Sequence, residues 1–149
     1  MLRVQSRPPV DYGLCNQVVT IYHQAGAGGH FSCSRIVFKG AFLDWSKNQS
    51  MNKTGSRETN TCLLVLPSRW GDRLAWCEPD QYDNLDPGSR ADFFTVAPGD
   101  KVLLGSGPEI LTREAWAAQI PAKTFGLVVI RDVDPKYFNG LVTHVEAGG

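Results

Sequence analysis

The sequence predicts a mainly β fold: a small β-barrel or sandwich of about six strands, with long loops and one short helix. Two observations favour this fold class. Short runs of β-prone residues, several of them alternating apolar and polar, recur between clusters of turn residues, and only residues 112–120 carry convincing helix signals. With 149 residues, the chain is expected to form a single domain at 14–149, preceded by an extended arm at 1–13.

The first two predicted strands lie on either side of a glycine-rich turn. From Cys15 to His23, side chains suited to a strand alternate between two faces. Strand character resumes over Ser34–Trp45, where Gly40 predicts a bulge or bend. The intervening residues 24–30 lack the Gly-Lys-Ser/Thr ending of a phosphate-binding loop, so they predict a flexible hairpin loop instead.

Two segments predict long loops. Ser46–Asn60 is polar, with almost no apolar residue except Met51, and it is too long for an ordinary hairpin loop. After the predicted strand Thr61–Leu66, residues 68–91 are aromatic, acidic and rich in turn residues. Aromatic residues are enriched at protein interfaces, which makes three residues of this loop interface candidates: Trp70, Trp76 and Tyr82. The alternative is that they stack on a sugar or a base, in a sugar- or oligonucleotide-binding β-barrel.

The next segment predicts a hairpin followed by the helix. Pro98-Gly99-Asp100 separates two apolar, β-prone runs within Asp92–Gly105, and these residue types favour a tight turn between two strands. Thr112 is the expected N-cap of the helix, and Pro121 lies at its end. The hairpin carries no evident nucleophile, base or metal ligand, so it is expected to support the body of the fold.

The most apolar segment lies near the C-terminus. Residues 124–133 predict the strongest strand, and 140–145 is expected to pair with it across a turn at 134–139. The apolar run Phe125–Ile130 has the length of a strand and falls short of the roughly 18 residues of a membrane span. Met1–Pro9 also lacks the apolar run of a signal peptide, so we expect neither export nor a membrane partner.

Charge and cysteine content narrow the functional classes. Lysine plus arginine and aspartate plus glutamate number 15 each, which argues against a general nucleic-acid or membrane-surface binder. Without an export signal, the cysteines are expected to stay reduced and to act as small buried hydrophobes: Cys15, Cys33, Cys62 and Cys77. The alternative, a zinc site built on His30 and Cys33, lacks a second local pair of ligands. We therefore predict no metal and no cofactor.

No catalytic pattern is evident in the sequence, and no enzyme activity is predicted. The chain has no Gly-x-Ser-x-Gly, HExxH or P-loop motif, and its histidines stand apart from one another: His23, His30 and His144. Asp44 and Glu58 flank the polar loop and leave an acid–base hydrolase as an alternative, although solvated loop charges are commoner. The loop has a basic bias from three candidates for contact with phosphate, such as DNA in a channel: Lys47, Lys53 and Arg57.

Taken in order, six segments resemble a family of small proteins of tailed phages and prophages. That family is usually classed as minor capsid or head–tail connector proteins of siphoviruses in Gram-positive hosts. The similar segments are Cys15–His23, Arg35–Trp45, Ser50–Gly55, Asn60–Pro67, Ala97–Gly105 and His144–Gly149. Val145 departs from the pattern, because the family commonly has an aromatic residue after the histidine.

The resemblance implies a virion protein of the phage neck that is made in the host cytoplasm. It would be a connector or head-closure (stopper) subunit, in a ring of about 6 or 12 copies closed by head-to-tail contacts. It would contact portal or adaptor proteins, tail proteins and, non-specifically, the packaged DNA. The segments expected to reach neighbouring subunits are the arm 1–13 and the loops 46–60 and 68–91.

Overall fold

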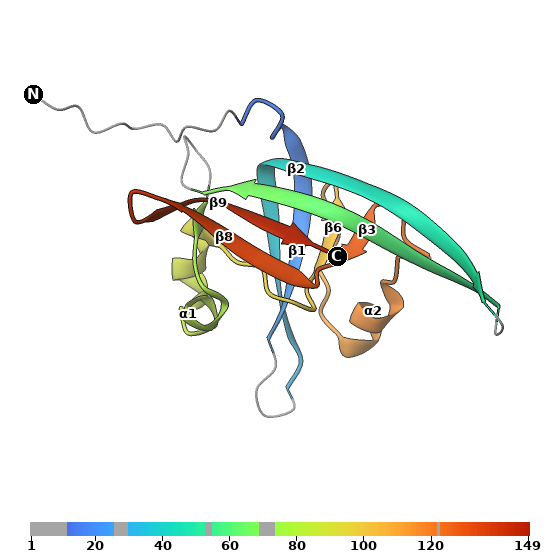
Figure 1. Ribbon diagram of the computed structural model, residues 1–149. Helices are drawn as coiled ribbons and strands as arrows, with labels where there is room; N and C mark the ends of the chain where they lie inside the picture. The colour runs from blue at the N-terminus through green and yellow to red at the C-terminus, as the bar shows by residue number, and fades with distance from the viewer. Residues whose placement is uncertain (1–11, 26–29, 53–54, 69–73, 122) are drawn as a thin grey trace, which may run out of the picture.

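A curled, seven-stranded antiparallel sheet forms the body of the molecule, so the predicted mainly β fold is confirmed (Figure 1). The computed structural model describes residues 12–25, 30–52, 55–68, 74–121 and 123–149, and the side chains of these residues except at 47–60. Its elements are β1 (Gln17–Ala25), β2 (Ser32–Asn52), β3 (Gly55–Pro67), β4 (Ala75–Trp76), α1 (Pro79–Asp83), η1 (Pro87–Asp92), β5 (Phe93–Phe94), β6 (Lys101–Leu104), α2 (Arg113–Ala118), β7 (Leu127–Val129), β8 (Asp132–Phe138) and β9 (Leu141–Gly148). In the described part of the chain, no helix is long and apolar enough to cross a membrane.

The sheet has the strand order β7-β6-β1-β2-β3-β9-β8, and it bends where β2 passes from one neighbour to the other. The first part of β2, up to Ala41, pairs with β1, and the part from Phe42 onward pairs with β3. Gly40 lies between these parts with a φ of 87°, and β1 offers it no partner in the register. An extra residue of this kind is a β-bulge, which bends the strand. The predicted bend at Gly40 is confirmed.

Replacing Gly40 with alanine is expected to lower the free energy of unfolding by about 1–2 kcal/mol, because a Cβ disfavours positive φ. Urea unfolding would measure the loss. Gly88→Ala is the matched control: its added Cβ would meet Asp86 Oδ2 at 3.6 Å, an ordinary contact, and its φ is not positive. That control should change stability by less than about 0.5 kcal/mol. Equal losses in both variants would contradict the role of Gly40 in the bend.

The two edge strands of the sheet, β7 and β8, follow one another directly in the sequence. Only Ile130 and Arg131 separate them, where the sequence predicts one continuous strand. The backbone N–H of Ile130 donates to the carbonyl of Asp100, and that of Arg131 donates to the carbonyl of Gly148. The chain therefore passes directly from one edge strand of the sheet to the other, which requires the two edges to lie close together. The sheet curls back toward itself for this reason. Strands that switch between sheet halves form the corners of such packings.

The core fills the inside of this curl. It is built from aliphatic side chains of several strands and from an edge-to-face pair, Phe38 and Phe94, whose ring centroids lie 4.9 Å apart. Its fully buried members include Val19, Ile21, Leu64, Leu66, Val96, Val102, Val128 and Val145. Burial of each such side chain contributes about 1.5–3 kcal/mol before conformational entropy is subtracted. This core holds in place the strands that carry the polar clusters described below.

The outer face of β1 is covered by the segment that contains α2. The hydroxyl of Tyr22, a fully buried residue, donates to the carbonyl of Pro108 at 2.7 Å. Lys101 Nζ donates to the carbonyls of Trp116 and Gln119 and lies 4.6 Å from the Trp116 ring centroid. The predicted helix is confirmed, and the side chain of its N-cap, Thr112, accepts from the Ala115 N–H.

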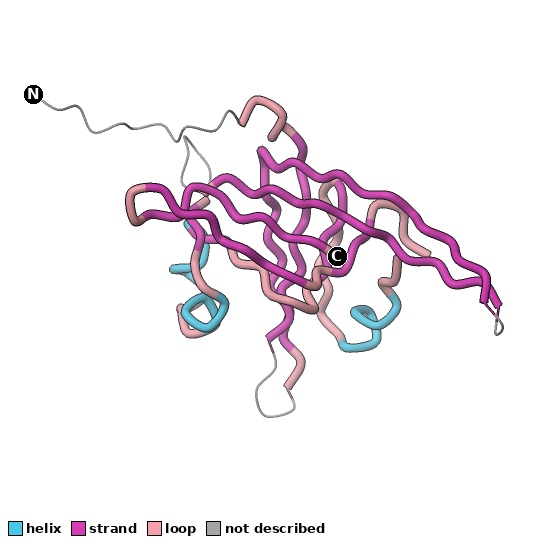
Figure 2. Tube along the Cα trace, viewed as in Figure 1, coloured by secondary structure: helices cyan, strands magenta, loops and turns pink. Residues whose placement is uncertain are grey.

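The polar segment predicted as a loop at 46–60 is instead a β-hairpin. β2 continues to Asn52, β3 starts at Gly55, and the two pair from Ser46 opposite Thr61 to Asn52 opposite Gly55. Figures 1 and 2 show this hairpin projecting from the curled sheet. The loop prediction was wrong because it took a lack of apolar residues as a lack of strands. These strands are polar because they project away from the core.

The structure around two predicted turns differs from the prediction. The turn at Pro98-Gly99-Asp100 is present, with an Asp100 N–H bond to Ala97 O and a φ of 94° at Gly99. However, the strands beside it do not pair with each other. β5 pairs in parallel with β4, and β6 pairs with β1 and β7, so the predicted hairpin is wrong. β8 runs through the predicted turn at 134–139, and the chain reverses at Asn139-Gly140, where both φ values are positive.

Candidate functional site

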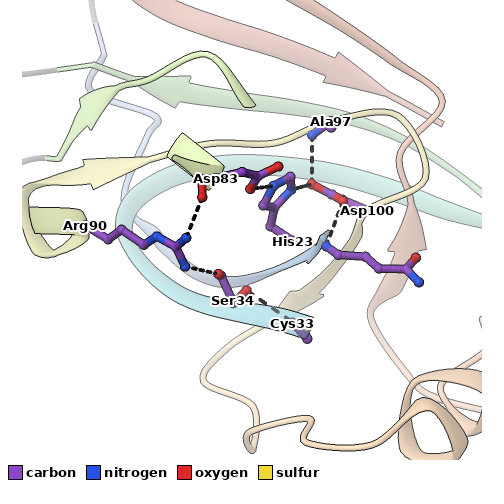
Figure 3. Close-up of polar contacts among 8 residues, drawn as sticks. His23, Cys33, Ser34, Asp83, Arg90, Ala97 and Asp100 are labelled. Carbon is purple, nitrogen blue, oxygen red and sulfur yellow. Dashed lines mark hydrogen bonds and ion pairs between the residues drawn. The ribbon is translucent and has the colours of Figure 1, made fainter. Parts of the chain in front are cut away.

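A buried polar cluster centred on His23 joins three elements of the fold (Figure 3). His23 lies on β1. Its Nδ1 is 2.7 Å from Oδ2 of Asp100, in the turn before β6, and its Nε2 is 2.8 Å from Oδ1 of Asp83, at the end of α1. His23 is 2% exposed, the Asp100 side chain is 3% exposed, and the Asp83 side chain is 36% exposed. The imidazole therefore lies between a buried carboxylate and a carboxylate that solvent reaches.

Backbone groups hold Asp100 in place. Its Oδ2 accepts the Ala97 N–H at 2.8 Å, and its Oδ1 accepts the Gln24 N–H at 3.2 Å. With His23, the carboxylate has three hydrogen-bond donors. A buried carboxylate is tolerated when donors and a counter-charge offset its lost hydration. This explains why the turn folds onto β1 instead of closing a hairpin.

The protonation of His23 follows from its partners. Burial alone would lower its pKa, but hydrogen bonds and charge from Asp100, and then from Asp83, outweigh burial and raise the pKa above the ordinary value. A carboxylate cannot donate, so both ring nitrogens must carry a proton to satisfy both contacts. The geometry therefore fits a doubly bonded imidazolium.

Two further side chains pack α1 and η1 against this cluster. The Tyr82 ring lies edge-on to His23, with centroids 5.8 Å apart, and the guanidinium carbon of Arg90 lies 5.2 Å from the Tyr82 ring centroid. Arg90 also donates to the carbonyl of Asp83 at 3.0 Å and to the hydroxyl of Ser34 at 3.3 Å. Figure 3 shows Arg90 reaching from η1 across to both of these groups.

This arrangement fits a structural contact that holds α1 and the turn before β6 against β1 better than it fits a catalytic base. A general base needs a nitrogen lone pair within reach of a substrate, and both nitrogens of His23 face carboxylates. Among the residues that the structure describes, no group of three or more histidine, cysteine, aspartate or glutamate side chains could hold a metal ion. The chemistry open to the cluster is the gain and loss of a proton.

A second histidine with two polar contacts, His144, lies on β9. The Tyr12 hydroxyl is 2.7 Å from Nδ1 of His144, whose Nε2 is 3.7 Å from Oε2 of Glu146. Burial lowers the pKa of His144, and Glu146 opposes that effect only in part. A neutral ring can accept the Tyr12 O–H at Nδ1 and point its Nε2–H toward Glu146. The contact fastens the start of the described chain to the sheet.

Two of the three predicted aromatic interface candidates, Trp76 and Tyr82, lie within the described residues, and Tyr82 is buried. Tyr82 is 3% exposed and belongs to the core, so it presents no surface to a partner in this conformation. It is buried because α1 turns this ring inward, and Tyr82 is the only buried residue in the helix. Trp76 is partly buried against Phe94, with centroids 5.5 Å apart. Trp70 lies outside the described residues.

The candidates in the polar segment lie on the projecting hairpin. Lys47 is in β2 and Arg57 is in β3, whereas Lys53 lies outside the described residues. The hydrolase alternative finds no support in the register. Asp44 pairs with Leu63 and Glu58 pairs with Gln49, five positions further along the hairpin, or roughly 16 Å.

The cysteines are only partly as predicted. Cys15 and Cys77 are buried, whereas Cys33 and Cys62 are of intermediate exposure. Burial, with smaller electrostatic contributions, raises the pKa of the Cys33 and Cys62 thiols to about 11, so neither thiol ionises readily near neutral pH. His30 is exposed, and it forms no metal-binding group with other described residues.

An aromatic pair near the base of the projecting hairpin, one ring exposed and the other partly buried, was not predicted from the sequence. Phe125 is 81% exposed, and its ring packs edge-on against Trp45, with centroids 5.1 Å apart. Trp45 lies on β2 just before the projecting part, and Leu63, on β3, is 45% exposed. The sequence places Phe125 in the strand predicted at 124–133, because it begins the most apolar run of the chain.

The model of a family of unknown function, DUF6751, matches residues 14–149. No curated protein and no solved structure matches the chain.

Proposed function

We propose that this chain, which belongs to the DUF6751 family, is a structural subunit of a phage neck. In this proposal it acts as a head–tail connector or head-closure (stopper) subunit, which assembles with copies of itself into a ring of about 6 or 12 between portal and tail. The observation that carries the proposal is the projecting β2–β3 hairpin, because it extends beyond the body of its own subunit (Figure 1).

The size of the hairpin suits a contact between subunits. Seven residues of β2, Ser46–Asn52, lie beyond Trp45, and an antiparallel strand rises about 3.4 Å per residue, so the hairpin reaches about 24 Å. A chain of this length has a radius of gyration of about 15 Å. The hairpin is therefore long enough to lie along a neighbouring subunit.

The backbone of the hairpin offers a means of attachment. Over 47–52 and 55–60, the register pairs the two strands only with each other, since β1 pairs with β2 only up to Ala41 and β9 pairs with β3 only from Leu63. Exposed strand edges bind extended segments of other chains through backbone hydrogen bonds. The Trp45–Phe125 pair adds an aromatic anchor of the kind found at the centre of interfaces.

The basic residues of the hairpin remain candidates for contact with packaged DNA. If several copies line a channel, Lys47, Lys53 and Arg57 from each would bring positive charge to it. Contacts with phosphate are non-specific and weaken as salt rises. The sugar- or oligonucleotide-binding alternative uses Trp70, Trp76 and Tyr82 as stacking surfaces, and of these Tyr82 is buried.

Mass spectrometry of purified phage particles from a host that carries this gene tests the proposal. The chain should be present in a fixed ratio to the portal protein. The number of copies in each particle should equal the number of subunits in one ring. A chain found in the lysate but absent from purified particles would overturn the neck assignment.

A further inference from the structure

We propose that His23 is a proton-controlled latch, which holds α1 and η1 against the sheet when it is protonated and releases them when it loses its proton. The cluster joins the segment 79–92 to the body of the fold, because Asp83 lies at the end of α1 while His23 and Asp100 belong to the sheet and its turn. This inference is independent of the ring proposal.

The contact with Asp83 is the part that should open. A neutral imidazole has a single N–H and can donate to only one of the two carboxylates. Asp100 is the more buried partner and is fixed by the Ala97 and Gln24 N–H groups, so the proton should stay on Nδ1. The Nε2 lone pair would then face the Asp83 carboxylate at 2.8 Å, which is a repulsive contact. Asp83 is 36% exposed and can move into water.

Among the described residues, the other titratable or charged side chains beside the cluster are less suited than His23 to act as the switch near neutral pH. Arg90, on η1, stays charged, and Tyr82, on α1, has a pKa raised by burial above its usual value near 10. Cys33, on β2, has a pKa of about 11. Lys101 follows Asp100, and burial lowers its pKa from a usual value near 10.4.

The segment that the latch holds has little local stability of its own. α1 is a five-residue helix, and its N-cap residue, Glu78, makes no side-chain capping bond. Helices this short are not stable without tertiary contacts. The other anchors include the Tyr82 ring, the partly buried Leu85 and the contacts of Arg90. One of the Arg90 contacts is with the Asp83 carbonyl, which would move with α1. Release would expose Tyr82, an aromatic residue suited to an interface.

The direction of the pH effect follows from the raised pKa of His23. The latch is fully engaged below the pKa of the released state, which is lower than that of the closed state because the contribution of Asp83 is lost. Between that pKa and the raised pKa of the closed state, the equilibrium constant for closing the latch falls up to tenfold for each pH unit. The latch therefore opens as pH rises.

Hydrogen–deuterium exchange across a pH series, combined with NMR titration of the imidazole, tests the latch in the full chain. Protection factors at 79–92 should fall up to tenfold per pH unit across the His23 titration, while those of β1 and β6 stay constant. At high pH, the ring should be in the Nδ1–H tautomer. Constant protection at 79–92, or an Nε2–H tautomer, would overturn the latch.

Two carboxylate variants separate the latch from general charge effects. Asp83→Asn should lower the pH at which His23 titrates, and it should make the protection factors of 79–92 independent of pH in this range, because an amide can accept from an imidazolium and donate to a neutral ring. Asp80→Asn removes one negative charge from the same helix at an exposed position, and it should leave both transitions in place. Identical profiles for the two variants would contradict the latch. If Asp83→Asn does not fold, His23→Gln replaces it as the variant, and it should make the protection factors of 79–92 independent of pH in this range.

Discussion

Replacing His23 with alanine is expected to lower the free energy of unfolding by about 3–5 kcal/mol, the usual cost of removing one partner of a buried ion pair. The variant leaves the Asp100 carboxylate, 3% exposed, without its counter-charge. It also disconnects α1 from β1. Chemical unfolding at pH 6, followed by circular dichroism, measures the loss.

His144→Ala is the comparison for this variant. It removes the contacts with Tyr12 and Glu146, but no buried carboxylate is left behind, since the Glu146 side chain is 36% exposed. A loss of about 1–2 kcal/mol is expected, from a hydrogen bond and some packing. Equal losses for both histidines would contradict a special role of the charged pair.

The pH dependence gives the same prediction a second test. His23 has a raised pKa in the folded state, so its pair contributes fully below the unfolded value of about 6.5. The contribution is lost as pH rises through the folded pKa. The stability difference between the wild-type protein and His23→Ala should therefore be larger at pH 6 than at pH 9.

Removing the projecting hairpin is expected to abolish assembly without unfolding the subunit. Trp45 and Cys62 are direct partners in the register, so an Asn-Gly turn can join them in place of residues 46–61. The core lies within the curled sheet and keeps all of its buried members. Light scattering coupled to size-exclusion chromatography should give a monomer mass, with the β-sheet circular dichroism of the wild-type protein.

A matched control keeps the hairpin and removes its proposed anchor. Phe125→Ser shortens a side chain that is 81% exposed, so the fold should be unaffected. The oligomer should dissociate at a higher protein concentration than the wild-type oligomer does. If the hairpin-deleted protein still forms the wild-type oligomer, the hairpin is not the assembly element.

Local signals in the sequence predicted much of the fold. Thr112 marks the start of α2 because its side chain satisfies a backbone N–H within the same turn. Gly40 marks the bend of β2 because only glycine adopts a φ of 87° without strain. Both are short-range effects that the sequence carries directly.

Two of the mispredicted elements differ in the signal that the sequence carries. Asn139-Gly140 is a strong signal for a two-residue hairpin turn, but the turn was predicted to begin at Asp134, five residues before Asn139. Pro135 is tolerated in β8 because β8 is an edge strand. The projecting hairpin was taken for a loop because strand patterns depend on a buried face, which a projecting hairpin lacks.

The candidate site could not be predicted from the sequence. Asp83 and Asp100 lie 60 and 77 residues from His23, and only the folded chain brings them together. No sequence spacing links these three residues, because each belongs to a different element of the fold. In the same way, the exposure of Phe125 depends on where β7 begins.

Native mass spectrometry of the purified, full-length protein tests the ring proposal most directly. One closed oligomer of about 6 or 12 copies is expected, and it should persist on dilution. The hairpin deletion should convert it to a monomer. A wild-type protein that remains monomeric from micromolar concentrations to the highest attainable one would contradict the ring proposal.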